Sequence, residues 1–186
     1  MSDPQSAILS AIQQAGLSDR FGPGKTAPAL REALKRLMPF LEAEPPPVHA
    51  AETIRLPGGD GERDARLYTP FSAPERGPTL LFLHGGGFVI GSLETYEGLC
   101  KRLCALSGAR VVSLDYRLAP EHRFPAANAD AEAAFDALSA GHLDCVDPER
   151  LAAGRGGAGG GLAASLARTP RGKVAFQLLI YPLLPL

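Results

Sequence analysis

The chain has 186 residues, of which 45% are hydrophobic and 21% are charged. These values indicate one folded domain with a hydrophobic core, and they exclude a disordered chain. The 19 basic residues nearly balance the 20 acidic ones, which excludes a basic surface of the kind that binds nucleic acid. The sequence has no signal-peptide pattern and no apolar run of about 18 residues, so we expect a cytoplasmic protein without a membrane span.

The three cysteines are Cys100, Cys104 and Cys145. Their spacing matches no metal-ligand pattern, and an odd number of cysteines argues against a disulfide framework. We therefore expect neither a metal site nor structural disulfides.

The N-terminal part of the chain contains two helical patterns followed by two short strand patterns. Apolar residues recur at helical spacing over 4–15 and 28–42, and prolines end the second pattern. Strand patterns at 51–56 and 64–69 are joined by the turn residues 57–61, which predicts a β-hairpin.

From residue 79 onward, strand and helix patterns alternate. The predicted elements are strands at 79–83, 109–114, 150–153 and 173–181 and helices at 95–107, 126–139 and 158–168. Continuous apolar strands separated by helices predict a mostly parallel sheet with helices on both faces. The fold class is therefore α/β, with an antiparallel N-terminal hairpin.

A glycine-rich segment, His84-Gly85-Gly86-Gly87-Phe88, directly follows the first of these apolar strands. Consecutive glycines let the backbone approach a ligand closely and turn its N–H groups toward one point. Such donors stabilise the oxyanion of an acyl-transfer intermediate, and lipases and esterases of the α/β-hydrolase fold use an HGGG turn in this way. A plain tight turn is the alternative.

A second segment, DYRLAPEHRFPAA at 115–127, begins some thirty residues further on. Together with the glycine turn it closely resembles the hormone-sensitive-lipase-like carboxylesterases, and the resemblance covers most of the chain. It implies an α/β-hydrolase fold with a helical cap segment at 1–48 and a partial core at 49–186 that lacks the family's C-terminal strands. It also implies hydrolysis of short-chain carboxylic esters, with structural roles for Glu121 and His122.

The expected nucleophile segment departs from the family's pattern. Residues 150–164 align without a gap to R-I-A-V-G-G-D-S-A-G-G-N-L-A-A, but Gly157 stands where the resemblance places the serine. Glycine has no hydroxyl, so no covalent acyl-enzyme is expected there. Neither Ser92 nor Ser165 follows a strand-to-helix elbow, and neither is expected to substitute. By the same resemblance, the oxyanion donors are the N–H groups of Gly86, Gly87 and Ala158, with Gly85 completing the turn.

The acid and base of the expected triad are also missing from the sequence. In this fold they follow the nucleophile along the chain, yet no Asp, Glu or His occurs after Glu149. We therefore expect a carboxylic-ester hydrolase by family whose given chain is catalytically incompetent. Two alternatives stay open: a non-catalytic remnant that binds a small carboxylate or ester, and a frameshifted or altered product of an active esterase gene.

Two further features of the C-terminal part have functional implications. Residues 154–159 fit the dinucleotide-binding pattern G-x-G-x-x-G, but the acidic residue expected about 20 positions later is absent. We therefore expect no cofactor.

The strand at 173–181 would lie inside the sheet of the family. Here its apolar side chains would lie on an exposed edge, namely Val174, Phe176, Leu178 and Ile180. Unpaired apolar edges pair with other chains, so we expect self-association through this strand.

Overall fold

The computed structural model describes residues 24–156, residue 166 and residues 174–180. Its elements are α2 (Ala27–Leu41), β1 (Ala50–Gly58), β2 (Gly61–Thr69), β3 (Gly77–Leu83), α3 (Glu97–Ser107), β4 (Arg110–Leu114), α4 (Ala126–Ser139), β5 (Val146–Gly156) and β6 (Phe176–Ile180). The predicted helix at 4–15 and most of the one at 158–168 lie outside the described residues. The division into a cap segment at 1–48 and a partial core at 49–186 stays a prediction.

The six described strands form one mixed sheet in the order β1-β2-β4-β3-β5-β6. The pairs β1–β2 and β2–β4 are antiparallel, whereas β3–β4, β3–β5 and β5–β6 are parallel. This arrangement confirms the predicted α/β fold class with an antiparallel N-terminal hairpin.

The hairpin is longer than the sequence pattern indicated. Its register runs from Ala50 opposite Thr69 to Gly58 opposite Gly61, so β1 continues through Pro57. A proline is tolerated here because β1 forms the edge of the described sheet, where its missing N–H breaks no ladder. The tip of the hairpin packs closely on α4.

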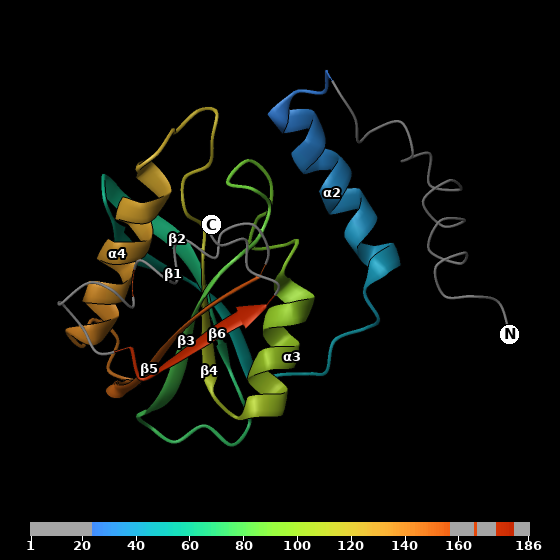
Figure 1. Cartoon of the computed structure of the whole chain (residues 1–186). Coiled ribbons are helices and arrows are strands. Elements are labelled where there is room, and N and C mark those ends of the chain that lie inside the picture. Colours follow the sequence, from blue (N-terminus) through green and yellow to red (C-terminus); the bar gives the residue numbers. More distant parts are fainter. Residues whose placement is uncertain (1–23, 157–165, 167–173, 181–186) are drawn as a thin grey trace, which may run out of the picture.

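Helices cover both faces of the sheet, as predicted (Figure 1). Alternate residues of β3 point to opposite faces: Leu81 and Leu83 join a core that includes Phe135 of α4, and Leu80 and Phe82 join one that includes Cys100 of α3. The continuous apolar run of β3 is therefore explained by burial on both sides.

Strand β5 is longer than the predicted 150–153, and β6 is shorter than the predicted 173–181. The glycines near the end of β5 have low strand propensity, but pairing with β3 on one side and β6 on the other overrides it. A Cβ at Gly154 would lie 2.7 Å from Leu80 Cδ1 and 3.2 Å from Leu178 Cβ. The first glycine of the G-x-G-x-x-G pattern therefore serves packing between strands.

Within the described part of the chain, no helix is long and apolar enough to cross a membrane.

Candidate functional site

The glycine turn, residues 84–88, follows the end of β3 and has an unusual backbone. Gly86, Gly87 and Phe88 have φ values of +124°, +63° and +64°. Three successive residues thus lie at positive φ, where glycine is favoured and a side chain such as that of Phe88 is strained. Other contacts must therefore hold the turn in this shape.

The glycines in and after the turn have two steric roles. A Cβ on Gly86 would clash with the Ile90 carbonyl oxygen, and a Cβ on Gly91 would clash with His84 Nδ1. A Cβ on Gly87 would meet nothing within 4 Å. Gly86 and Gly91 therefore permit the turn to close, whereas Gly87 leaves open space beside it.

Some N–H groups at the turn are hydrogen-bonded within it, and others have no described acceptor. Those of Val89 and Ile90 both donate to the Gly86 carbonyl, at 3.1 and 3.0 Å. No described residue accepts a hydrogen bond from the N–H of Gly86 or Gly87. Two adjacent amide donors that no described residue accepts from are suited to an anionic or carbonyl oxygen.

His84 is fully buried, and its side chain contacts the backbone of the turn. Its Nδ1 lies 2.9 Å from the Gly85 carbonyl oxygen, and because a carbonyl only accepts, Nδ1 carries the proton. The Tyr116 hydroxyl donates to the His84 carbonyl at 2.6 Å, and the two rings stack with centroids 4.3 Å apart. These contacts make His84 a structural residue of the turn and leave it poorly placed to act as a general base.

A second loop, between β4 and α4, packs against the turn. The N–H of Ala119 donates to the Phe88 carbonyl at 2.7 Å, and Arg31 of α2 binds backbone carbonyls of both loops. Glu121 pairs with Arg31, which fits its expected structural role, and His122 is exposed with its N–H donating to the Leu118 carbonyl. The sequence did not single out Arg31.

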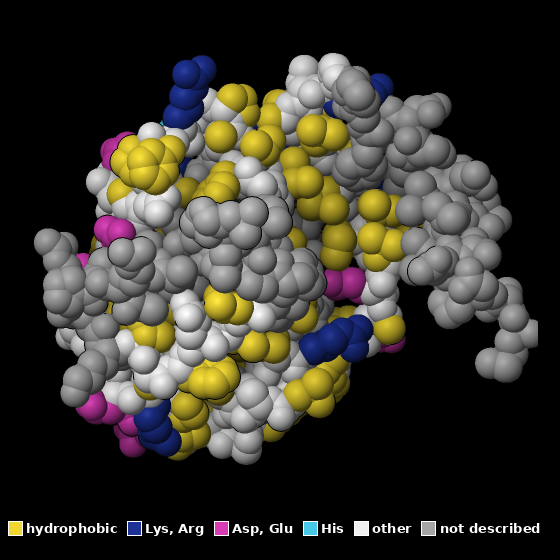
Figure 2. Space-filling model, in the orientation of Figure 1, with side chains coloured by type: hydrophobic (Ala, Val, Ile, Leu, Met, Phe, Trp, Pro, Cys, Tyr) yellow, Lys and Arg dark blue, Asp and Glu magenta, His cyan; other side chains and the backbone are white. Residues whose placement is uncertain are grey.

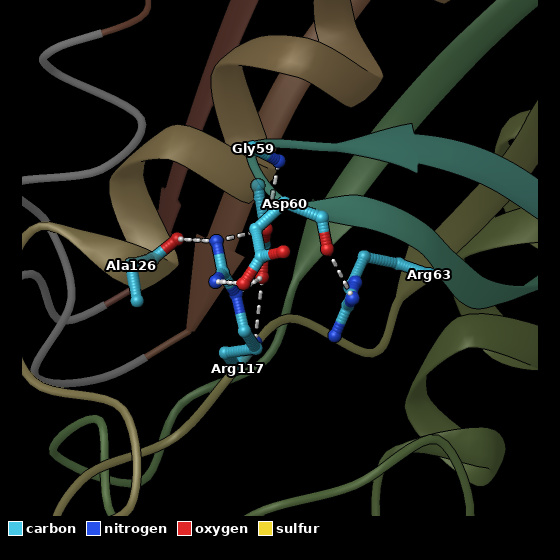
Figure 3. A network of polar contacts seen from close by, with 6 residues as sticks. Gly59, Asp60, Arg63, Arg117 and Ala126 are labelled. Carbon is cyan, nitrogen blue, oxygen red and sulfur yellow. Dashed lines mark hydrogen bonds and ion pairs between the residues drawn. The ribbon is translucent and has the colours of Figure 1, made fainter.

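Arg117 joins this loop to the hairpin tip and to α4 (Figure 3). The Asp130 carboxylate is fully buried and accepts from Arg117 Nε, Nη2 and N–H and from the Gly59 N–H, at 2.8 to 3.0 Å. Arg117 Nη1 also bonds Asp60 Oδ2 at 2.7 Å. Burial by itself would raise the pKa of Asp130, but the bonds and charge of Arg117 outweigh burial and lower it. The Asp130 carboxylate therefore has a structural role: it joins α4 to the hairpin tip and to the β4–α4 loop.

A small, mostly apolar cavity of about 240 Å³ lies next to the turn. Its walls include Phe88, Ala119, Phe124 and Ala127. The turn and the loop thus meet at this cavity, which Phe88 and Ala119 line together, and we take the three as one candidate site.

The remaining predicted site residues divide into two groups. Gly157 and Ala158, together with Ser165, lie outside the described residues. Ser92 lies in a local turn before α3, where its Oγ accepts from the Thr95 N–H at 3.3 Å. Over the described ranges, no group of His, Cys, Asp and Glu could hold a metal ion.

The sequence pattern of the α/β-hydrolase-fold family matches residues 80–186. The chain belongs to the hormone-sensitive-lipase-like carboxylesterases of this fold. Esterase LipI of Mycobacterium tuberculosis is 40% identical over 136 residues, covering 69% of this chain and 42% of LipI. The chain therefore spans less than half the length of this curated esterase.

The chain is also similar to solved structures of esterases and again covers only part of each. An ester hydrolase from the metagenome of Lake Arreo, complexed with a bipyridine phosphonate derivative, has a TM-score of 0.84 and 37% identity, over 98% of this chain and 60% of its own. A hyperthermophilic esterase from the archaeon Pyrobaculum calidifontis has a TM-score of 0.80 and 40% identity, over 97% and 59%. This carboxylesterase-family chain thus corresponds to about three fifths of each neighbour.

Proposed function

We propose that this chain supplies the oxyanion-donor part of a carboxylic-ester hydrolase site. The observation that carries the proposal is the glycine turn, in which no described residue accepts from the N–H groups of Gly86 and Gly87 and a Cβ on Gly87 would meet open space. In acyl transfer, negative charge develops on the carbonyl oxygen of the ester, and donors placed in advance stabilise that charge. The adjacent cavity of about 240 Å³ suits a short acyl or alcohol group.

The given 186 residues lack the groups that attack the ester. The resemblance puts Gly157 at the nucleophile position, and the sequence holds no acidic residue after Glu149 and no histidine after His142. Without a hydroxyl and a base, the donors can bind an oxygen but cannot form an acyl-enzyme. We therefore infer that this polypeptide binds and does not turn over esters.

Hydrolysis of 4-nitrophenyl butyrate tests this proposal. The chain is expected to give no burst and no rate above that of buffer, and Gly157→Ser is expected to give the same result because the base is still missing. A burst from the unmodified chain, or turnover restored by Gly157→Ser alone, would overturn the inference of incompetence.

A carboxylate-binding role is the second candidate, favoured by the same two amide donors, from which no described residue accepts a hydrogen bond. Calorimetric titration with butyrate separates it from a merely structural turn. Binding in the unmodified chain that Gly87→Ala weakens supports the role, since the added methyl group would enter the open space at this position. Heat equal to that of dilution in the unmodified chain would refute it.

We further propose that the chain self-associates through β6. Among the described strands β6 pairs only with β5, and Phe176 at its start is 63% exposed. A groove of about 350 Å³ beside β6 is lined mainly by apolar residues, including Leu80, Leu103 and Leu178. Hydrophobic side chains are visible on this face where Figure 1 shows β6 (Figure 2). An apolar edge next to an apolar groove favours pairing with a second copy.

A further inference from the structure

Arg31 occupies a position that nothing in its local sequence explains. It lies in α2, yet its side chain is only 25% exposed and reaches two loops at once. Nε donates to the Val89 carbonyl at 2.8 Å, and Nη2 donates to the Ala119 carbonyl at 2.9 Å. One guanidinium therefore joins a helix of the N-terminal segment to the exit of the glycine turn and to the neighbouring loop.

The remaining donors of the same group bind Glu121. Nη1 and Nη2 lie 2.9 and 2.7 Å from the two carboxylate oxygens, a bidentate arrangement that fixes the plane of the guanidinium. Arg31 is the main reason that the pKa of Glu121 is lowered to about 2, so the pair stays charged throughout the neutral range. Glu121 thereby orients the two N–H groups that reach the carbonyls.

The part of the turn that Arg31 contacts is the strained part. Phe88 has φ +64° without being glycine, and its carbonyl is held by the Ala119 N–H at 2.7 Å. Arg31 binds the carbonyl of Ala119 and that of Val89, which directly follows Phe88. Arg31 therefore holds the two residues to which Phe88 is joined: Val89 through the peptide bond and Ala119 through the hydrogen bond. Phe88 directly follows the two donor residues, Gly86 and Gly87.

We propose that Arg31 is a positioning residue, which holds the oxyanion-donor turn in its binding conformation and couples that turn to α2. The claim about binding rests on the proposed function, whereas the claim about the turn's conformation does not. A planar fork is required because three acceptors in different directions are bound at once, and a lysine ammonium on a flexible stem cannot reproduce that geometry.

Native-state amide hydrogen exchange in Arg31→Lys tests the conformational claim. The N–H groups of Val89, Ile90 and Ala119 are hydrogen-bonded within the two loops, and their exchange is expected to accelerate by about tenfold or more when the clamp is lost. Amides of the β1–β2 hairpin, to whose described residues Arg31 forms no hydrogen bond or ion pair, are expected to exchange at their original rates.

Arg36→Lys is the matched control, because Arg36 lies on the same helix, is 56% exposed and bridges Glu32. Glu121→Gln is a second variant that keeps both carbonyl contacts available, and it is expected to accelerate turn exchange less than Arg31→Lys does. Equal exchange in Arg31→Lys and Arg36→Lys would overturn the proposal, as would acceleration spread evenly over the hairpin amides.

Butyrate calorimetry on the same variants tests the link to binding. Arg31→Lys is expected to raise the butyrate Kd by about tenfold relative to Arg36→Lys. An unchanged Kd beside accelerated turn exchange would overturn the coupling to binding. If the unmodified chain does not bind butyrate, the carboxylate-binding role fails, and the exchange data alone decide the conformational role of Arg31.

Discussion

At the scale of single residues, Gly86 and Gly87 of the turn differ in what a methyl group would meet. Gly86 has φ +124° and an added Cβ would clash with the Ile90 carbonyl oxygen, whereas Gly87 has φ +63° and an added Cβ would meet nothing within 4 Å. We expect Gly87→Ala to lower the free energy of unfolding by about 1 kcal/mol, the cost of a left-handed alanine. Gly86→Ala is expected to cost about 3 kcal/mol or more, because strain and a backbone clash add. Urea titrations of both variants check this order, and equal losses would contradict it.

The cysteines give a second prediction at this scale. Burial raises the pKa of Cys100 to about 12 and that of Cys104 to about 11, whereas Cys145 is only half-buried. Since the thiolate is the reactive form, one thiol per chain is expected to react with Ellman's reagent at pH 8 under native conditions. The other two are expected to react only after unfolding. Rapid reaction of Cys100 or Cys104 in the native protein, located by peptide mass mapping, would contradict the described packing.

At the scale of elements, the Arg117–Asp130 pair fastens the hairpin tip and the β4–α4 loop to α4. Both side chains are buried, with exposures of 10% and 0%. Removal of one partner leaves a buried charge, so Asp130→Asn is expected to lower the free energy of unfolding by about 3–5 kcal/mol at pH 7. Denaturant titration measures this loss, and a loss below about 1 kcal/mol would show that the pair is not needed.

The same pair predicts a pH dependence of stability. The folded state lowers the pKa of Asp130 below its ordinary value of 3.8. The ionised carboxylate therefore contributes stability that is fully present above about pH 4 and is lost as the pH falls through the folded pKa. The difference between the unmodified chain and Asp130→Asn is expected to shrink on acidification below pH 4. A difference that stays constant from pH 7 to pH 3 would assign the stabilisation to another group.

Elements defined by local pattern could be predicted from the sequence, and contacts between distant backbone groups could not. The helix at 126–139 has the bounds that its periodicity indicates, and the hairpin lies where its turn residues predict. Strand β5 was predicted too short because Gly154 and Gly156 are poor strand formers, and only pairing with two neighbours extends it.

In the candidate site, too, the local pattern could be predicted and the distant contacts could not. Three successive glycines after an apolar strand identify the turn from the sequence alone. Arg31 leaves no such signal, because two of its partners are backbone carbonyls 58 and 88 residues further along the chain. Any residue can supply a carbonyl, so no pattern of side chains could mark the contact.

At the scale of the whole molecule, the proposed self-association rests on β6, which among the described strands pairs only with β5. We expect sedimentation velocity to show dimers or larger species at micromolar concentration, because an apolar edge strand pairs readily. Phe176→Lys is expected to shift the distribution toward monomer, since a charged side chain on an edge opposes pairing. Phe124→Lys is the control, because Phe124 is 85% exposed but lies in the β4–α4 loop beside the candidate site. A monomeric unmodified chain would contradict the proposal.

We propose that this esterase-family chain has oxyanion donors but no activated serine nucleophile. The most direct measurement is the intact mass of the protein after incubation with a serine-directed fluorophosphonate, beside an active serine esterase as a labelling control. We expect an unchanged mass for this chain under conditions that label the control completely. A stoichiometric phosphonyl adduct on any serine, such as Ser92 or Ser165, would show that the chain carries an activated nucleophile and would refute the proposal.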